Sequence, residues 1–284
     1  MSNPNKDSIH TCDCQILAHY QFAGAQYILT LESDIIANQT KPGQFVHISV
    51  ADGLLCRPIS VMSVDVENGT FDLLYKVVGA GTQKLSERKI GEVLAVIGPI
   101  GNGFKITENK RPLLIGGGVG MPPMIAIAQQ IKASEHQPFV ILGSEIEFPF
   151  ATLESKIGKN YQGAKRTMPL LEEWKIACRL ASLQDYDGVF KGLVTDLAYA
   201  YLQDLSVDEL AQVEIYCCGP EPMLKAVAKL AEEYNLPCQV SLEEYMACAV
   251  GGCAGCVVSV QTSAGSSMQR VCVDGPVFNA RAVF

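Results

Sequence analysis

Four cysteines near the C-terminus have the types and spacing of a redox-active metal site. They follow the pattern Cys248-x4-Cys253-x2-Cys256-x15-Cys272, and small Gly and Ala residues fill most of the short gaps. A C-x4-C-x2-C run with a distant fourth cysteine is typical of plant-type [2Fe–2S] ligation. Two bridged irons need four convergent thiolates, and small residues let the backbone approach them closely. The spacing therefore predicts a [2Fe–2S] cluster held by these four cysteines.

Two other uses of these cysteines remain open. Structural zinc sites prefer two C-x2-C pairs, and this chain has a single one, at Cys253 and Cys256. The cysteines could also be buried or disulfide-linked. An odd total of eleven, in a chain whose start shows no apolar secretory segment, argues against a disulfide framework. The seven cysteines outside the cluster are scattered, which is typical of small buried hydrophobic residues.

Length and composition limit the class of protein. The chain has 284 residues, of which 48% are hydrophobic and 18% charged, enough apolar material for two domains and a small appendix. The chain contains no run of eighteen apolar residues, so the sequence predicts no membrane-spanning helix. The start, MSNPNKDSIHTCDCQ, lacks a signal-like apolar region, so we expect a cytoplasmic protein. A net charge of −8 without a basic block disfavours nucleic acid or an anionic membrane as partner.

The elements that must position the cysteines fall into three regions. Residues 1–106 contain short apolar and β-branched runs separated by turns, which predicts about six strands of an antiparallel barrel. Residues 107–236 alternate strands with helices, which predicts a parallel α/β sheet. Residues 237–284 form a smaller cluster-binding region. The fold class predicted is therefore a β-barrel, an α/β domain and a small C-terminal [2Fe–2S] segment.

In the α/β region, some strands and helices are predicted clearly by the sequence pattern and others are not. Predicted strands cover residues 112–118, 139–145 and 213–218. Apolar periodicity predicts helices over 121–134, 195–205 and 221–235. Residues 151–159 are expected to be helical, and residues 170–183 could be helical as well. The rest of the tract 161–187 has no assignment.

Glycine turns in both domains could bind phosphate groups. In PLLIGGGVGMPPM (112–124), a strand, a glycine turn and a helix start could bind a dinucleotide diphosphate, because the helix start supplies backbone N–H donors. The spacing of its glycines is not G-x-G-x-x-G, so the alternative that this turn is structural and binds no ligand remains open. Arg57 could meet an anion or lie at the surface. Cys218 follows a strand end where α/β sheets bind ligands, whereas Cys217 is expected in the core.

Taken in order, these motifs resemble the ferredoxin–NADP reductase superfamily, in which a flavin-binding barrel precedes a nicotinamide-binding domain. The motifs are PGQF (42–45), RPIS (57–60), GAGT (79–82), GPIGNGF (98–104), IGGGVGMPP (115–123) and CCGPEPM (217–223). The tail SLEEYMACAVGGCAGCVV (241–258), with VCVDGPVF (271–278), resembles the electron-transfer subunits of two-component, NAD-linked dihydroorotate dehydrogenases. The resemblance covers nearly the whole chain. Tyr245 departs from it, because relatives often carry a basic residue there.

The resemblance implies a role for each matching residue of the barrel. Arg57 would pair with the FAD diphosphate, while Pro58, Ile59 and Ser60 would line the isoalloxazine ring. Ser60 would donate a hydrogen bond near the reactive flavin nitrogen, which makes it a candidate catalytic residue. The other implied flavin contacts are Leu74, Tyr75 and Lys76 on a second strand and Gly81 and Thr82 in the diphosphate turn.

The resemblance also implies the nicotinamide site. The dinucleotide would be cradled by Gly117, Gly118, Gly120 and Met121. The residues beside the nicotinamide would be Cys218, Gly219 and Pro220, with Cys218 as the second candidate catalytic residue. The segment GSEIE (143–147) carries acids rather than the arginines expected for a 2′-phosphate, which favours NAD over NADP.

The expected cofactors suggest a converter of paired into single electrons. Nicotinamides exchange hydride, clusters carry one electron, and a flavin can do both. By resemblance, the partner is an FMN-containing dihydroorotate dehydrogenase subunit in a heterotetramer, and electrons pass between it and NAD. Three alternatives stay open: a reductase serving another acceptor such as a ferredoxin, a metal-stabilised interaction module without flavin, and an oxygenase reductase.

Overall fold

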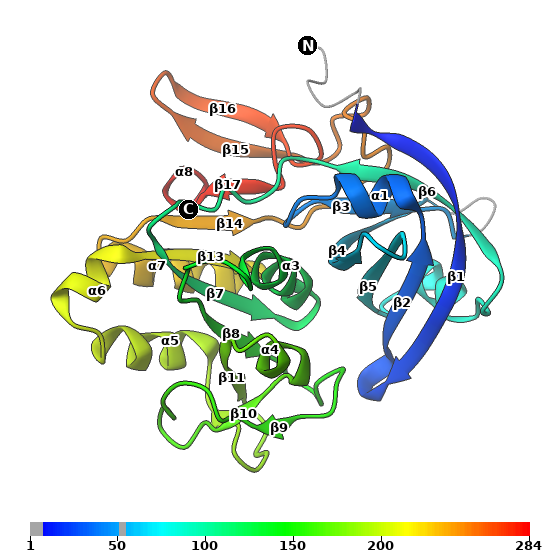
Figure 1. The fold of residues 1–284 in the computed structure, drawn as a ribbon. Coiled ribbons are helices and arrows are strands. Elements are labelled where there is room, and N and C mark those ends of the chain that lie inside the picture. Colours follow the sequence, from blue (N-terminus) through cyan, green and yellow to red (C-terminus); the bar gives the residue numbers. More distant parts are fainter. Residues whose placement is uncertain (1–7, 51–54) are drawn as a thin grey trace.

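The computed structural model describes residues 8–50 and 55–284. A β-barrel lies beside a seven-stranded sheet with helices on both faces, and a C-terminal hairpin lies above the sheet (Figure 1). The predicted fold class is confirmed. No helix in the described part of the chain is long and apolar enough to cross a membrane.

The barrel closes from six antiparallel strands in the order β1-β2-β5-β4-β3-β6. The strands are β1 (His10–Phe22), β2 (Gln26–Glu32), β3 (Phe45–Ile48), β4 (Arg57–Asp65), β5 (Thr70–Lys76) and β6 (Val93–Ile100). Alternate residues point inward, so that Leu29, Leu73 and Val96 meet in the barrel core. The first strand, β1, has the weakest apolar pattern of the six, because polar residues fill much of it.

Short helical elements complete the barrel. They are the 3-10 turn η2 (Ala23–Ala25) and the helices α1 (Asp34–Gln39) and α2 (Ala80–Ser86). The side chain of Ser33 caps α1 by accepting the N–H of Ile36. Helix α2 begins at Ala80, within the GAGT motif (79–82), so a helix start lies at the predicted diphosphate position.

The seven-stranded sheet has the order β12-β11-β8-β7-β13-β14-β17, and all strands are parallel except β17. Its strands are β7 (Arg111–Gly117), β8 (Phe139–Gly143), β11 (Ala177–Ser182), β12 (Phe190–Lys191), β13 (Val213–Cys218), β14 (Cys238–Ser241) and β17 (Val277–Asn279). The associated helical elements are η3 (Gly118–Gly120), α3 (Met121–Ile131), α4 (Pro169–Glu173), α5 (Val194–Gln203), α6 (Val207–Gln212) and α7 (Glu221–Glu233).

Both faces of this sheet are covered, which explains its continuous apolar strands. In β7, Leu113 and Ile115 pack in the core with α5 and α7, whereas Leu114 packs on the opposite face with α3 and α4. Met62 and Leu74 of the barrel join this second core. The α3 face of the sheet is therefore also the face that holds the barrel.

Two helix predictions in the tract after β8 are wrong. Residues 151–159 hold the two-residue strand β9 (Leu153–Glu154), paired with β10 (Arg166–Thr167), and otherwise irregular chain. Ser155 and Lys156 donate hydrogen bonds to the carboxylate of Glu172 there, so side-chain contacts replace the bonds of a helix.

The segment 170–183 is helical only at its start. Helix α4 ends before Lys175, whose φ of 59° lies in the left-handed region. The following residues form β11, which is buried on both faces. Periodicity cannot distinguish such a buried strand from a buried helix, which accounts for the error.

The C-terminal region extends the sheet and adds a separate hairpin. Strands β14 and β17 pair with each other, and β14 also pairs with β13. The sheet therefore continues across the expected boundary at 236/237. The hairpin consists of β15 (Val257–Thr262) and β16 (Gly265–Arg270), and the short helix α8 (Ala280–Val283) ends the chain.

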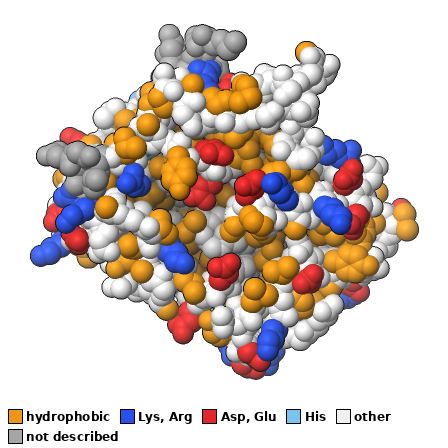
Figure 2. Space-filling view, turned by 180° about the vertical axis from the view of Figure 1, so that it is seen from behind, with side chains coloured by type: hydrophobic (Ala, Val, Ile, Leu, Met, Phe, Trp, Pro, Cys, Tyr) orange, Lys and Arg blue, Asp and Glu red, His pale blue; other side chains and the backbone are white. Residues whose placement is uncertain are grey.

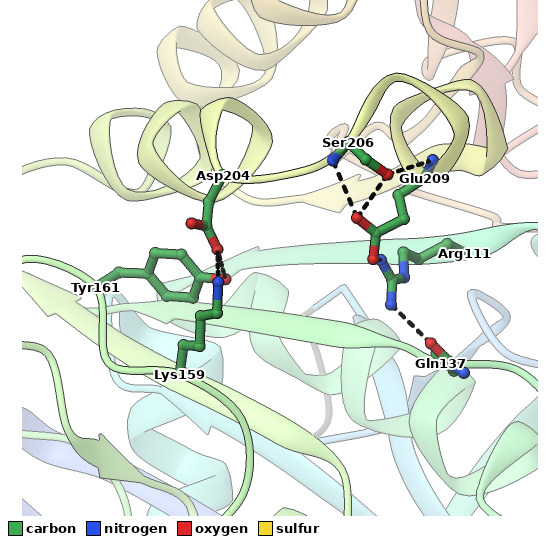
Figure 3. Close-up of polar contacts among 7 residues, drawn as sticks. All are labelled: Arg111, Gln137, Lys159, Tyr161, Asp204, Ser206 and Glu209. Carbon is green, nitrogen blue, oxygen red and sulfur yellow. Dashed lines mark hydrogen bonds and ion pairs between the residues drawn. The ribbon is translucent and has the colours of Figure 1, made fainter.

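Polar networks fasten the edge of the sheet where the parallel strands begin. Arg111 forms an ion pair with Glu209 at 2.7 Å and donates to Gln137, while Glu209 accepts from the N–H and hydroxyl of Ser206 (Figure 3). These contacts tie the start of β7 to the N-terminus of α6.

A second network in the same view joins Lys159 and Tyr161 to Asp204 after α5 (Figure 3). Both networks lie away from the carboxyl ends of the strands, where a ligand would bind.

Candidate functional site

Three of the four C-terminal cysteines lie in the loop before the hairpin β15–β16, and Cys272 follows directly after it. The backbone N–H of Cys253 donates to Cys248 Sγ at 3.4 Å, and the Cys256 thiol donates to Cys272 Sγ at 3.3 Å. The structure thus brings the cysteines together as two pairs. Cys256 and Cys272 are buried, whereas Cys253 is exposed.

This arrangement fits a binuclear cluster. A cluster of two irons needs four thiolates divided between the irons, which two pairs of cysteines can supply. The residues that would hold it are Cys248, Cys253, Cys256 and Cys272.

The loop backbone is shaped by small residues. Ala249, Gly251 and Ala254 have φ values of 55°, 85° and 53°, all in the left-handed region. A side chain at Gly251 would meet Val273 at 2.5 Å. These conformations curl the loop and turn its N–H groups toward sulfur, as the 3.4 Å bond from Gly255 N to Cys253 Sγ shows.

The local environment changes the acidity of the thiols in opposite directions. Burial alone would raise the pKa of Cys248, but hydrogen bonds from the N–H groups of Cys253, Val250 and Gly252 outweigh it and lower the pKa to about 7. Burial and the neighbouring Cys256 raise the pKa of Cys272 to about 12. The backbone N–H groups of the loop therefore favour the thiolate form of Cys248.

The predicted diphosphate site of the barrel is brought together. The guanidinium of Arg57 lies directly over Gly81, where a Cβ atom would overlap it. The Thr82 hydroxyl accepts the N–H groups of Val78 and Gly79 and is buried, so it holds the turn. Arg57 donates to the carbonyl oxygens of Leu55 and Cys56, which leaves the rest of its five N–H groups for an anion.

The three residues after Arg57 are divided between two faces of β4. Ile59 packs in the barrel core, whereas Pro58 and Ser60 lie on the outer face, where they pair with His47 and Phe45 of β3. Only Pro58 and Ser60 can therefore present side chains to a ligand outside the barrel. Their flavin contacts stay a prediction.

The second predicted flavin strand is divided in the same way. Leu74 and Lys76 point out of the barrel, and Leu74 packs at the interface with the α/β domain. Tyr75 points inward and stacks on Tyr27, with 5.3 Å between the ring centroids. Its hydroxyl oxygen forms a hydrogen bond of 2.8 Å with Nε2 of His19. Burial raises the pKa of the Tyr75 hydroxyl.

The two predicted nicotinamide segments meet at the carboxyl ends of neighbouring strands β7 and β13. A Cβ at Gly120 would overlap the backbone of Cys218, and one at Gly117 would meet Met223 at 2.5 Å. Gly118 has a φ of 56° and open space around it. Gly117 and Gly120 therefore allow close packing within the protein, and Gly118 is the position of the three that leaves room for a dinucleotide at this edge.

The remaining residues of this site differ in exposure. Pro220 precedes α7 and Gly219 lies against Met223. Met121 is fully buried, so its side chain belongs to the core rather than to an open cradle.

The two adjacent cysteines of β13 have different surroundings. Cys217 is fully buried in the core, as expected. Cys218 is also largely buried, with 9% exposure, on the opposite face. Burial, with the nearby carboxylate of Glu243, raises the pKa of Cys218 to about 12. The group available at this edge is therefore a neutral thiol.

Sequence reasoning did not single out His47, which the structure buries on β3 opposite Pro58 of the predicted flavin strand. Its signal was weak, since a single histidine in the apolar run QFVHISV is easily taken for a core residue. Tyr245, which departs from the resemblance, is 94% exposed beside the cysteine loop.

Comparisons with known proteins define the class of the chain. Residues 24–104 match the oxidoreductase FAD-binding domain family, and residues 243–284 match the iron–sulfur cluster binding domain of dihydroorotate dehydrogenase B. The fold and the site are those of an oxidoreductase subunit with FAD-binding and iron–sulfur-binding regions.

Relatives along nearly the full length identify the family. The dihydroorotate dehydrogenase B (NAD+) electron transfer subunit of Caldanaerobacter subterraneus subsp. tengcongensis is 35% identical, with 95% of this chain and 96% of that protein covered. The Bacillus mycoides protein of the same name is 36% identical, with 89% and 90% covered. The chain belongs to the family of dihydroorotate dehydrogenase B (NAD+) electron transfer subunits, which confirms the resemblance.

Solved structures agree with this result. The structure of an NADH-dependent reduced ferredoxin-NADP oxidoreductase, described for flavin-based electron bifurcation, has a TM-score of 0.78 and 26% identity, with 97% of this chain and 91% of that chain covered. A ferredoxin reductase of carbazole 1,9a-dioxygenase has a TM-score of 0.64 and 25% identity, with 81% and 67% covered.

Proposed function

We propose that this chain passes electrons between NAD and a partner FMN-containing dihydroorotate dehydrogenase subunit, through FAD and a [2Fe–2S] cluster. One observation carries the proposal. Cys256 and Cys272 share a hydrophobic core with Phe45 of the barrel, and Phe45 pairs directly with Ser60 on β4. The cluster cysteines and the outer face of the predicted flavin strand are thus parts of one packed unit.

Each group of residues has a physical task in this function. When bound, FAD exchanges hydride with NAD and single electrons with the cluster. Arg57 and the Gly81 turn bind and orient the diphosphate, while Pro58 and Ser60 line the outer face of β4. Ser60 contributes a hydroxyl that can donate a hydrogen bond to the flavin ring.

The edge formed by β7 and β13 brings the dinucleotide to that ring. Gly118, which has open space around it, lets the backbone approach the diphosphate. The start of α3 adds the positive end of its helix dipole, because Pro122 and Pro123 have no N–H to donate. Cys218, a neutral thiol in our proposal, adds polarizable bulk without charge beside the nicotinamide. Acidic Glu145 and Glu147 after β8 would repel a 2′-phosphate, so NAD is the expected nucleotide.

The proposal includes the assembly. We expect a heterotetramer of two such chains with two FMN-containing subunits, located in the cytoplasm, with no nucleic acid as partner. On the face shown in Figure 2, Lys and Arg side chains are scattered among acidic ones. The division into residues 1–106, 107–236 and 237–284 is proposed to separate the FAD, NAD and cluster functions.

A second candidate function keeps the cofactors but changes the acceptor. Similarity to two solved proteins whose names mention ferredoxin supports a reductase that serves a ferredoxin. Pull-down with the purified catalytic subunit, compared with a ferredoxin as bait, distinguishes the two partners.

Anaerobic absorbance spectroscopy tests the function itself. The purified protein should show flavin and iron–sulfur bands, and NADH should bleach both together. A colourless protein with one tetrahedral zinc would contradict the proposal. Bleaching of the flavin alone would mean that no path joins it to the cluster.

A further inference from the structure

Gln26, the first residue of β2, carries a buried amide at the contact between the barrel and the α/β domain. Only 2% of this residue is exposed. Leu29 faces the barrel core, whereas Ile28 packs against the core of the α/β domain, so strand alternation places Gln26 on the same outer face as Ile28. Its cross-strand neighbour on β5 is Lys76, a predicted flavin contact. Gln26 therefore lies beside the predicted flavin strand and faces the other domain.

The side-chain amide of Gln26 reaches the loop that follows β8. Its Nε2 donates to the carbonyl oxygen of Glu147 at 2.8 Å and to that of Ala23 at 3.0 Å. An amide carries its two N–H groups at one end, so these two acceptors use both donors and fix the orientation of the amide. One buried side chain thus joins the turn η2 of the barrel to the GSEIE segment (143–147).

A second contact joins the same two segments. Gly24 has a φ of 67°, and a Cβ atom at this position would overlap Cδ1 of Ile146, so the isoleucine side chain lies directly on the bare backbone of the turn. On either side of Ile146, Glu145 and Glu147 are exposed. The barrel therefore holds the middle of the segment and leaves both carboxylates at the surface.

The position of these carboxylates matters for nucleotide binding. Strand β8 pairs in parallel with β7, so the segment after β8 lies at the same edge of the sheet as the proposed dinucleotide turn. At such an edge, an acidic side chain can accept a hydrogen bond from the 2′-hydroxyl of the adenosine ribose, and its charge repels a 2′-phosphate. An apolar residue in place of Gln26 could also hold the two domains together, but it would not fix a backbone carbonyl of this segment.

We propose that Gln26 is a positioning residue for nucleotide recognition, which holds the backbone of Glu147 on the barrel and so keeps the two carboxylates of the segment where they favour NAD over NADP. The inference rests on the proposed function and deepens it, because it makes the choice of nucleotide depend on a residue of the other domain. Gln26 acts through the loop backbone and does not touch the nucleotide.

Two variants of Gln26 in the cofactor-loaded protein test the inference. Gln26→Met keeps the length of the side chain without its donors, and Gln26→Glu keeps its shape but places an acceptor against two carbonyl oxygens. The measurement is steady-state reduction of ferricyanide by NADH and by NADPH. We expect the KM for NADH to rise about fivefold with little change in kcat, as the loss of one hydrogen bond predicts. The preference for NADH over NADPH in kcat/KM should fall at least as much.

The control separates this role from a general loosening of the two domains. Gln129→Met is the same substitution and removes a different pair of hydrogen bonds between the barrel and the α/β domain. It should lower the melting temperature and leave the nucleotide preference as in the original chain. If Gln129→Met changes the preference as much as Gln26→Met does, the inference is wrong.

Ile146→Ala provides a second test that keeps Gln26. It removes the apolar contact with Gly24 at the surface of the molecule, and it should lower the preference for NADH in the same direction. An unchanged preference in the folded Gln26 variants overturns the inference. If those variants do not fold, an unchanged preference in Ile146→Ala overturns it instead. A wild-type protein without flavin and iron bands, or one whose bands NADH does not bleach, would contradict the proposed function rather than the role of Gln26.

Discussion

Gln129 of α3 and Val64 of β4 are joined by two reciprocal hydrogen bonds. The Val64 N–H donates to Gln129 Oε1 at 3.0 Å, and Gln129 Nε2 donates to the Val64 carbonyl at 2.8 Å. Strand β3 pairs with β4 only from Arg57 to Ser60. At Val64 the side-chain amide of Gln129 therefore makes the hydrogen bonds that a neighbouring strand would otherwise make. Helix α3 starts at the dinucleotide turn, and β4 starts at Arg57. The pair therefore links the two proposed cofactor sites.

Replacing Gln129 with Met should destabilise the contact between the two domains. Methionine has a similar length but leaves the half-buried N–H and carbonyl of Val64 without partners. We expect the free energy of unfolding to fall by about 1–3 kcal/mol in urea denaturation. Gln83→Met, on the exposed side of α2, is the control and should change little. Equal stability of both variants would show that water replaces the amide without loss.

Gly81→Ala should weaken FAD binding while leaving the fold intact. The new methyl group would overlap the end of the Arg57 side chain, which is flexible and can move aside. Losing a charge-assisted contact of about 1.5–3 kcal/mol corresponds to about 10–100-fold weaker binding. Gly79→Ala is the matched control, because Gly79 is extended and has open space around it. FAD titration of the apoprotein measures both, and unchanged affinity in Gly81→Ala would separate Arg57 from the flavin.

Gly120→Ala should be more damaging at the nicotinamide edge. Its Cβ would overlap the backbone of Cys218, and backbone in a central strand cannot move aside cheaply. We expect a higher KM for NADH and a lower melting temperature. Gly118→Asn, at a left-handed position with open space, should be milder because Asn tolerates this conformation. The reverse order of severity would mean that the two strands separate readily at this edge.

Glu209 makes stability depend on pH in the acid range. The N–H of Ser206, the guanidinium of Arg111 and the Ser206 hydroxyl lower its pKa from 4.5 to about 2. The unfolded chain therefore binds more protons in this window, and the stabilisation present above pH 4.5 is lost as the pH falls toward 2. Urea midpoints of the wild type and Glu209→Gln should differ near neutral pH and converge in acid.

The control for this pH effect is Glu233→Gln, an exposed residue at the end of α7. Its urea midpoints should follow those of the wild type at every pH. If Glu209→Gln also follows the wild type throughout, the ion pair with Arg111 contributes nothing to folding.

The sequence predicted those parts of the site whose chemistry depends on residue type and spacing. The cysteine spacing and the glycine turns are local signals, and the structure brings Arg57 to Gly81 and Gly120 to Cys218 as their order suggested. Strand β11 could not be predicted, because it is buried on both faces and a short, continuous apolar run has the same pattern in a buried strand and in a buried helix. His47 could not be found either, since its burial opposite Pro58 depends on a strand pairing that only the tertiary fold sets.

Cys253→Ser offers the most direct separation of the cluster from the flavin. Cys253 is exposed, so serine should disturb the core less than at buried Cys256. Because oxygen is a poorer ligand for iron than thiolate, we expect iron content and the reduced EPR signal to fall sharply while FAD absorbance is retained. NADH should still bleach the flavin, but reduction of a one-electron protein acceptor should be lost. Cys12→Ser, in β1 of the barrel, is the control and should keep all five properties. Full iron content in Cys253→Ser would remove this residue from the ligand set, whereas loss of the flavin band as well would mean that the loop is required for the barrel to bind FAD.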